Sequence, residues 1–384
     1  MKLLVSILSI LTLFLVVTGA ASAAQRTTLY NFGAGFVGPI TLAQDGSLYG
    51  VMNTGEVFHL SPDAPAWRKD TLYQLVDDGI NFGNFSPLTL RDDGSLLGSS
   101  EGLLGPGHGN IFLLTPPGGG TPAWTKSVLH TFTGNPDGEW PIGGFTPDGQ
   151  GSYLGFTDRG GSADGGTFYR LTPPVSGSNW SIQTVIDFIW SNGALPSARP
   201  VPNGKGSFYG ILAGSKDIIS LTPPAAGQST WTQTLLHRYP ADLWEFRWPL
   251  VVDKNGAIYG TTANKIFRLI PPTPKQTKWK SVILMSFNKK NLIPNGFGLS
   301  GVVVDANGVI YGLTSQGGSS TACGKTGCGT LFKLTPPVPG QTKYTFTVID
   351  QQAGGNGLIV DQTGALYGTA GSSVFTVTGS GFQP

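Results

Sequence analysis

Short apolar runs separated by polar turns recur along almost the whole chain, and the segment 250–272 shows the pattern most clearly. It reads LVVDKNGAIYGTTANKIFRLIPP. Its first apolar run, 250–253, stops before an Asn-Gly pair, and both residues tolerate the positive φ that a tight hairpin turn demands. A second strand is expected over 257–260 and a third over 266–270, where Phe267 and Leu269 lie on one face with the period of two that is typical of a half-buried strand.

A fourth strand completes this unit. Pro271 and Pro272 end the third strand, because proline cannot donate to a sheet ladder. A polar loop with Trp279 follows, and the apolar run 282–287 then predicts one more strand. The unit is therefore predicted to be a four-stranded antiparallel meander.

The same unit is found seven times. The glycine that closes its second strand recurs at intervals of 48 to 57 residues, close to the period of roughly 40 to 50 residues that is typical of four-stranded propeller blades. These glycines are Gly50, Gly98, Gly155, Gly210, Gly260, Gly312 and Gly368. The repeats predict a β-propeller with seven blades.

The first and last repeats complement each other. The segment 28–32 reads as a fourth strand with no blade before it, whereas 358–378 supplies three strands and no fourth. An open array would leave a long unpaired edge, which favours aggregation. We therefore predict an all-β fold, a closed seven-bladed β-propeller of four-stranded antiparallel blades whose last blade is completed by the N-terminal strand.

The first residues have the pattern of an export signal. Lys2 precedes an apolar run, 3–17, that is short for a membrane span, and residues 21–23, Ala-Ser-Ala, have the small-x-small pattern of a signal-peptidase site. Residues 1–23 are predicted to be a cleaved signal peptide and 24–384 a single propeller domain, secreted or periplasmic, with no membrane span after cleavage. An uncleaved N-terminal anchor is the alternative.

Composition fits an exported all-β protein and suggests no helices. Charged residues make up 12% of the chain, about half of the roughly 25% usual in soluble domains, and the 57 glycines and 28 prolines suit a fold with many turns. With a net charge of +2 and no basic block, neither nucleic acid nor an acidic membrane surface is expected as the main partner. We expect a monomer.

The two cysteines, Cys323 and Cys328, lie in one excursion of the sixth repeat, CGKTGC. In an exported protein their closeness favours a local disulfide, although so small a loop gives only modest stabilisation. A metal half-site is the alternative, but the second ligand pair that tetrahedral zinc requires is missing. We predict no metal site and no cofactor.

The nine tryptophans fall into two groups. Five open or precede fourth strands at one offset and are expected to pack between or over blades: Trp67, Trp124, Trp180, Trp231 and Trp279. The other four lie in three successive connections between blades: Trp140, Trp190, Trp244 and Trp248. Such connections share a face with those that join second to third strands, so Asp158 and Arg159 are predicted to lie on the same face.

Exposed tryptophans in such loops can stack on sugar rings or anchor a protein partner. Phe246, Arg247 and Trp248 follow one another and would supply both stacking and a fixed donor fork. The predicted ligand is therefore a carbohydrate or a protein bound to one face of the propeller. The alternative is that these tryptophans plug the central channel or cover seams between blades.

The signals for catalysis are weaker. Of the four histidines only His108 lies in a face loop, because the others fall on predicted strands. The acidic loops 135–139 and 157–164 could pair carboxylates for acid/base chemistry, but polar loop tips are usually solvated. Asp253 and its equivalents precede the first hairpin turn and are assigned to turn formation. No catalytic residue is assigned, and a hydrolase or lyase with a loop-borne acidic site is the alternative to a non-enzymatic binding protein.

Two repeated motifs carry a resemblance to a known family. They are visible as DANGVIYG at 305–312 and GTLFKLTPP at 329–337, and a tryptophan and a VLYxF-like strand follow them in the repeat. Residues 27–378 resemble the GloVer tandem-repeat family of exported bacterial proteins with varying (choice-of-anchor) surface anchors. The resemblance implies a location more than a biochemical role. Nothing after Thr378 resembles a sorting or membrane tail, so a product without an anchor is expected.

Overall fold

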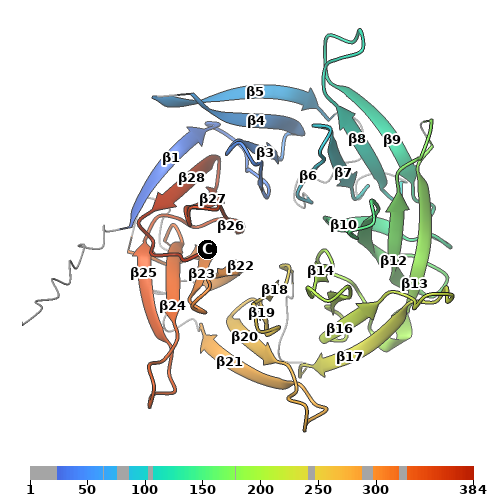
Figure 1. The fold of residues 1–384 in the computed structure, drawn as a ribbon. Coiled ribbons are helices and arrows are strands. Elements are labelled where there is room, and N and C mark those ends of the chain that lie inside the picture. The colour runs from blue at the N-terminus through green and yellow to red at the C-terminus, as the bar shows by residue number, and fades with distance from the viewer. Residues whose placement is uncertain are drawn as a thin grey trace, which may run out of the picture.

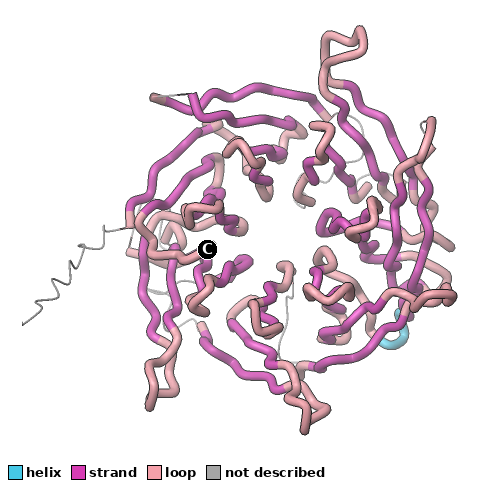
Figure 2. Tube along the Cα trace, viewed as in Figure 1, coloured by secondary structure: helices cyan, strands magenta, loops and turns pink. Residues whose placement is uncertain are grey.

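The computed structural model is a ring of seven four-stranded antiparallel sheets (Figure 1). It describes residues 24–63, 65–75, 86–102, 107–177, 179–240, 247–287, 297–319 and 327–384. Strands and loops make up nearly all of these ranges, whose one helical element is a short 3-10 turn, η1 (Trp190–Asn192) (Figure 2). The prediction of an all-β, seven-bladed propeller is confirmed.

Each blade runs from an innermost to an outermost strand. Blade one contains β2 (Thr41–Leu42), β3 (Leu48–Val51), β4 (Glu56–Asp63) and β5 (Ala66–Gln74), and blade two contains β6 (Thr89–Leu90), β7 (Leu96–Ser100), β8 (Asn110–Thr115) and β9 (Thr125–Thr131). Blade three contains β10 (Glu139–Pro147), β11 (Tyr153–Arg159), β12 (Asp164–Thr172) and β13 (Ser181–Ile189), and blade four contains β14 (Val201–Pro202), β15 (Phe208–Leu212), β16 (Asp217–Thr222) and β17 (Thr232–Arg238). Blade five contains β18 (Val251–Val252), β19 (Ile258–Thr261), β20 (Lys265–Ile270) and β21 (Lys280–Ser286), and blade six contains β22 (Phe297–Val304), β23 (Ile310–Gln316), β24 (Thr330–Thr335) and β25 (Thr345–Asp350). Blade seven contains β26 (Leu358–Val360), β27 (Leu366–Ala370), β28 (Ser373–Thr378) and β1 (Gln25–Asn31).

The outermost strand of blade seven comes from the first part of the described chain. β1 pairs antiparallel with β28, from Gln25 opposite Thr378 to Asn31 opposite Ser373 (Figure 1). How much this pairing contributes to the stability of the ring stays a prediction.

A glycine on each second strand makes room for an aromatic ring. A Cβ added to Gly50 would lie 2.5 Å from Cζ of Phe58 on the third strand, and six blades share this arrangement. Blade four has Ile219 at the aromatic position, and there a Cβ on Gly210 would lie 3.0 Å from Phe156 of blade three. The recurrence of this glycine along the sequence is therefore explained by ring packing.

The core consists of apolar clusters between neighbouring blades. In one of them, buried Tyr209 of blade four packs with buried Ile258 of blade five. The tryptophans assigned to the repeat are partly buried against such clusters, which confirms that prediction: Trp67, Trp124, Trp180, Trp231 and Trp279. Trp231 of blade four, for example, meets Phe168 of blade three edge to face, with 5.2 Å between ring centroids.

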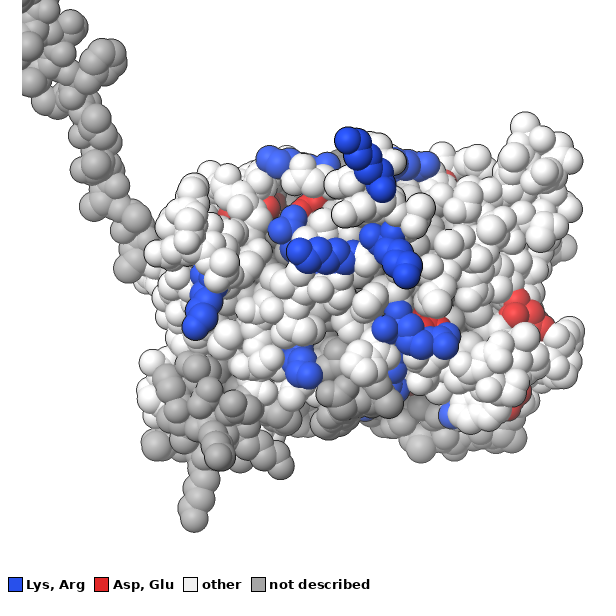
Figure 3. Space-filling view, turned by 90° about the horizontal axis from the view of Figure 1, so that it is seen from below, with Lys and Arg blue, Asp and Glu red and all other residues white. Residues whose placement is uncertain are grey.

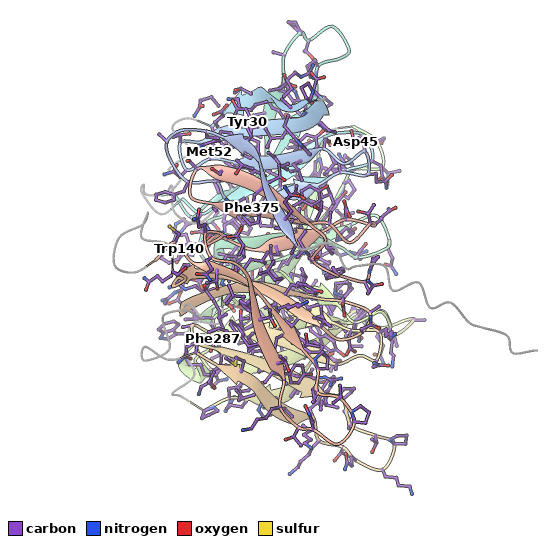
Figure 4. All side chains as sticks on the ribbon, turned by 90° about the vertical axis from the view of Figure 1, so that its left-hand side faces the viewer. Tyr30, Asp45, Met52, Trp140, Phe287 and Phe375 are labelled. Carbon is purple, nitrogen blue, oxygen red and sulfur yellow. The ribbon has the colours of Figure 1, made fainter. Side chains whose placement is uncertain are left out.

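The ring has two different faces. The turns from first to second strands and the loops from third to fourth strands lie on one face, the turn face; the other connections lie on the loop face. Asp45 marks the turn face, and Met52 and Trp140 mark the loop face (Figure 4).

Each first turn contains an Asp or Asn that accepts backbone hydrogen bonds. In blades three to seven this residue opens the turn, as Asp253 does with a hydrogen bond of 2.9 Å, which confirms the turn role predicted for Asp253 and its equivalents. In blades one and two Ala43 and Arg91 open the turn, and the Asp follows two residues later.

This turn also explains why most innermost strands are short. β18 is only Val251–Val252, whereas the sequence pattern predicted a strand over 250–253. Asp253 already belongs to the turn, so its side chain bonds the turn rather than extending the strand.

Candidate functional site

The inner strands of blade three extend onto the loop face. β10 has nine residues, whereas most innermost strands have two or three. It begins at Glu139 and β11 ends at Arg159, and these two residues are register partners. Gly143 and Gly144, both at positive φ, lie within the register shift of β10. Such a bulge redirects a strand and its side chains, which places Glu139 and Arg159 together above the ring.

His108 of blade two is held against this extension at two points. Its Nδ1 lies 2.5 Å from Glu139 Oε2, and its backbone oxygen accepts a hydrogen bond from the Trp140 N–H at 2.8 Å. Trp140 has a φ of 59°, which is uncommon for a large residue and typical of backbone that the surrounding structure holds in place. The imidazole and the carboxylate are therefore positioned so that a proton can pass between them.

Arg159 lies over the ring of Trp190. Its guanidinium carbon is 4.1 Å from the ring centroid, which is close enough for a cation–π interaction. Trp190 opens η1 and is 43% exposed, and its N–H donates to the Ala163 oxygen at 3.0 Å. The Nε atom of Arg159 is buried and has no hydrogen-bond partner among the described residues. This arrangement suits a ligand that brings a hydrogen-bond acceptor to an aromatic surface.

Asp158 occupies an unfavourable place for a carboxylate. Burial raises its pKa, the charge of Arg159 opposes this effect, and the charge of Glu139 adds to it. The Arg159 Nε to Asp158 Oδ2 distance is 4.0 Å, too long for a hydrogen bond. When it is protonated, Asp158 can donate a hydrogen bond as well as accept one. We refer to His108, Glu139, Asp158, Arg159 and Trp190 as the blade-three site.

A second histidine–acid pair shapes the connection into blade three. His130 Nε2 lies 2.8 Å from Asp137 Oδ2, and Asp137 Oδ1 accepts a hydrogen bond from the Thr133 N–H at 3.0 Å. Burial acts to raise the pKa of Asp137, but the hydrogen bonds from Thr133 and His130 outweigh it, so the pKa is lowered. Because both carboxylate oxygens of Asp137 are engaged within the loop, we assign this pair a structural role.

A shallow hollow in blade four adjoins the blade-three site. It is lined by Gly214, Ser215, Lys216, Arg238, Tyr239 and Pro240. Arg238 donates two hydrogen bonds to buried Asp217, at 2.6 and 2.8 Å. Gly193, which ends η1, lies against Gly214, since a Cβ on Gly214 would be 2.1 Å from the Gly193 oxygen. Trp190 and this hollow therefore belong to one stretch of the loop face.

Trp248 lies in a different environment from Trp190. Its Nε1–H donates to the Leu299 oxygen at 3.1 Å, and a Cβ on Gly301 would lie 3.6 Å from its side chain. Trp248 thus ties the entry into blade five to blade six, which fits the seam-covering role that the sequence left open as the alternative. The neighbouring Arg247 is exposed.

Several predicted features lie outside the described residues. They are Trp244, Phe246, Cys323 and the predicted signal peptide, 1–23. Cys328 is described, but its disulfide with Cys323 stays a prediction.

The pairing of His108 with Glu139 was missed by reasoning from the sequence. The two residues are 31 positions apart and belong to different blades, so no local motif signals their contact. The available signal is their place in the repeat. A second-to-third strand connection and the start of the next blade's first strand both lie on the loop face, and consecutive blades are neighbours.

Within the described ranges, no three histidine, cysteine or acidic side chains are grouped so that they could hold a metal ion. No helix in these ranges is long and apolar enough to cross a membrane.

The solved structures that resemble this chain are other propellers. Streptogramin B lyase has a TM-score of 0.60 at 13% identity, over 94% of this chain and 99% of that one. A catalytically inactive variant of virginiamycin B lyase from Staphylococcus aureus with quinupristin has 0.59 at 14%, over 92% and 98%. YCF48 bound to D1 peptide has 0.57 at 13%, over 94% and 97%. No family model and no curated protein matches the chain. At these identities the likeness shows the fold alone.

Proposed function

We propose that this protein is an exported, non-enzymatic propeller that binds an exposed segment of another protein at the blade-three site. The stack of Arg159 on Trp190, with its unpartnered buried Nε, is the observation that carries the proposal. Arginine and tryptophan are enriched at the centres of protein interfaces, where they supply a fixed donor fork and a large contact area. A carbonyl or carboxylate of the partner would accept hydrogen bonds from the partly exposed guanidinium of Arg159.

A carbohydrate is the less favoured ligand. Sugar rings stack on an open indole face, and the guanidinium of Arg159 already covers one face of Trp190. The structure of YCF48 bound to D1 peptide supports a protein ligand by analogy, because that propeller holds a peptide on a similar fold.

Matched arginine variants test the proposal. Wild-type protein, Arg159→Ala and Trp190→Ala would be screened on peptide and glycan arrays, and the affinities of hits measured by calorimetry. Arg91→Ala is the control, because Arg91 lies over Trp180 at 5.2 Å in a similar stack on the turn face. We expect each site variant to weaken peptide binding about thirtyfold, as interface anchors do on truncation. Hits on glycans alone, or equal peptide binding by every variant, would contradict the proposal.

A hydrolase or lyase is the second candidate function, and one observation favours it. His108 Nδ1 is 2.5 Å from Glu139 Oε2, and Asp158, whose pKa is raised, lies beside Glu139. Carboxyl groups with different proton affinities can act as acid and base in one site. A hydrolase and lyase substrate panel between pH 4 and 8 tests this with Glu139→Gln. Turnover that this variant loses while it keeps its melting temperature would favour the enzyme.

We also propose that the protein is exported, that it belongs to the GloVer family and that Cys323 and Cys328 form a disulfide. The resemblance of the repeats to the GloVer family and the apolar run 3–17 support an exported product. The intact mass of protein recovered outside the cytoplasm should correspond to cleavage after Ala23. Alkylation without reduction should find no free thiol if Cys323 and Cys328 are bridged, and sedimentation velocity tests the expected monomer.

A further inference from the structure

Charge is unevenly divided around the ring. Residues 247–350, which contain blades five and six, hold 12 of the 24 Lys and Arg residues but 3 of the 22 Asp and Glu residues, a local net charge of +9. The rest of the chain therefore has a net charge of −7. The overall net charge of +2 is the sum of these two opposite local charges. It therefore does not argue against an anionic partner for one side of the molecule.

Six exposed lysines of blades four to six lie on the turn face. They are Lys205, Lys254, Lys275, Lys278, Lys280 and Lys343, which we refer to as the lysine patch. None of them forms an ion pair with another described residue. Figure 3 shows the outer rim of this part of the ring edge-on, where Lys and Arg side chains gather and acidic side chains are sparse.

Basic residues in the other blades are more often neutralised by a neighbour. Arg91 lies 2.8 Å from Asp93, and Arg170 lies 2.7 Å from Asp148. Near the lysine patch, the Asp253 carboxylate accepts hydrogen bonds from the N–H groups of its own turn. The positive charge of the patch is therefore left for a partner to neutralise.

The lysine patch covers an area rather than a line. Lys205 and Lys254 lie in turns beside innermost strands, whereas Lys275 and Lys343 lie in loops that lead to outermost strands. These turns and loops end on one face of the ring, so the charges spread across three blades. A linear polyanion would contact only part of such an area, whereas a flat anionic surface contacts all of it at once.

The side chains also disfavour nucleic acid as the partner. Lysine ammonium groups are point charges without the planar fork that reads bases. The aromatic residues beside them, Trp279 and Tyr344, are partly buried against core clusters and are not free to stack on bases.

We propose that the lysine patch docks the turn face on an anionic lipid bilayer. Each lysine near an anionic leaflet strengthens binding by about fivefold. Val338, which is 60% exposed, lies in the same loop as Lys343 and brings an apolar side chain to the surface. In this orientation the loop face points away from the membrane and the blade-three site stays accessible. The proposal does not depend on the function assigned to that site.

Vesicle binding tests this proposal. Full-length protein would be sedimented with vesicles of phosphatidylcholine containing 30% phosphatidylglycerol, and with vesicles of phosphatidylcholine alone. Lys275→Glu/Lys278→Glu is the test variant. Arg68→Glu/Lys126→Glu, in blades one and two, makes the same change in net charge on the other side of the ring. The same measurements on a chain that begins at Ala24, the predicted mature start, distinguish this binding from binding by the apolar run 3–17.

We expect the wild type to bind anionic vesicles at least tenfold more strongly than neutral ones, and to lose this preference in about 0.5 M salt, where screening acts over a few ångströms. The test variant should bind anionic vesicles at least 25-fold more weakly, since two lysines are lost, and the control less than threefold more weakly. Equal binding to both kinds of vesicle, equal losses in the two variants, or binding to polyphosphate without binding to vesicles would overturn the proposal.

Discussion

Aspartates on the turn face and on the loop face are held in opposite ways. On the turn face, hydrogen bonds from the Ser47 hydroxyl and N–H lower the pKa of Asp45. On the loop face, burial raises the pKa of Asp158, and the charge of Glu139 adds to this effect. The folded chain therefore stabilises the charged form of Asp45 and destabilises the charged form of Asp158.

This difference separates aspartates with a structural role from an aspartate of the candidate site. The turn-face aspartates repeat from blade to blade and bond the backbone that they turn, so they serve folding. Asp158 has no such bond and lies beside an exposed aromatic residue and an arginine with an unused donor. A titratable group held at a cost to stability is typical of a site selected for binding or chemistry.

Deleting β1 should have the largest effect on stability, because this strand is the outermost strand of blade seven. Leu29 and Tyr30 pack against a core cluster, and Arg26 lies over Phe375 at 4.7 Å. Removing residues 25–32 should lower the free energy of unfolding by about 4 kcal/mol or more, as two large apolar contacts and a strand ladder are lost. Urea denaturation measures the change.

The control for this deletion removes residues 379–384. This deletion has a cost of its own, because Phe382 is 7% exposed and packs on Tyr311 with 5.3 Å between ring centroids. We therefore expect a loss of about 2 kcal/mol. Equal losses for the two deletions would show that β1 does not have a special part in the ring.

Asp305→Ala should destabilise the turn face by about 2 kcal/mol. The Asp305 carboxylate is buried and accepts hydrogen bonds from the Asn307 and Val309 N–H groups at 2.9 and 2.8 Å. Removing it leaves these donors without their partner. Asp158→Ala on the loop face should change stability by less than about 0.5 kcal/mol, because it bonds no backbone donor. Chemical denaturation of both variants at pH 7 makes the comparison, and a larger loss for Asp158→Ala would reverse it.

Two tryptophans sharpen the comparison within the loop face. Trp248→Ala should cost roughly 2 kcal/mol, because the variant loses a hydrogen bond to Leu299 and a half-buried ring. Trp190→Ala should lower the melting temperature little, since Trp190 is exposed and its backbone bond remains. Calorimetry of both variants distinguishes them. Similar losses would mean that Trp190 is a structural residue like Trp248.

The repeated parts of this molecule could be predicted from the sequence and the unrepeated parts could not. The seven second-strand glycines, the turn glycine four residues before each of them and the structural tryptophans recur at fixed places in the repeat, so each copy supports the interpretation of the others. The blade-three site depends on the bulge at Gly143 and Gly144, which occurs in β10 and aims Glu139 at a histidine of another blade. Contacts between blades at unrepeated positions leave no periodic signal. For that reason Trp190 and Trp248 looked equivalent in the sequence, although their environments differ.

The smallest expected effect is on the pH dependence of stability in two Asp→Asn variants. It is also the most direct test of the difference between the turn-face and the loop-face aspartates. Asparagine is compatible with the position of Asp45 in this turn, because Asn255 and Asn307 occupy the corresponding position, one residue before the turn glycine, in blades five and six. Asp45→Asn therefore removes the charge and keeps the turn. Asp158→Asn likewise removes only the charge.

The two variants should depart from wild type in opposite directions as the pH rises. The folded-state pKa of Asp45 is lowered, so its contribution to stability is present above the unfolded pKa of about 3.9 and is lost as the pH falls through the folded pKa. Asp45→Asn should then be less stable than wild type at pH 7 and equal to it near pH 2. The folded-state pKa of Asp158 is raised, so wild type loses stability as the pH rises through that value. Asp158→Asn should gain on wild type between pH 3 and 7. Urea denaturation at several pH values measures both differences, and curves with the same slope would show that the two faces do not hold their aspartates differently.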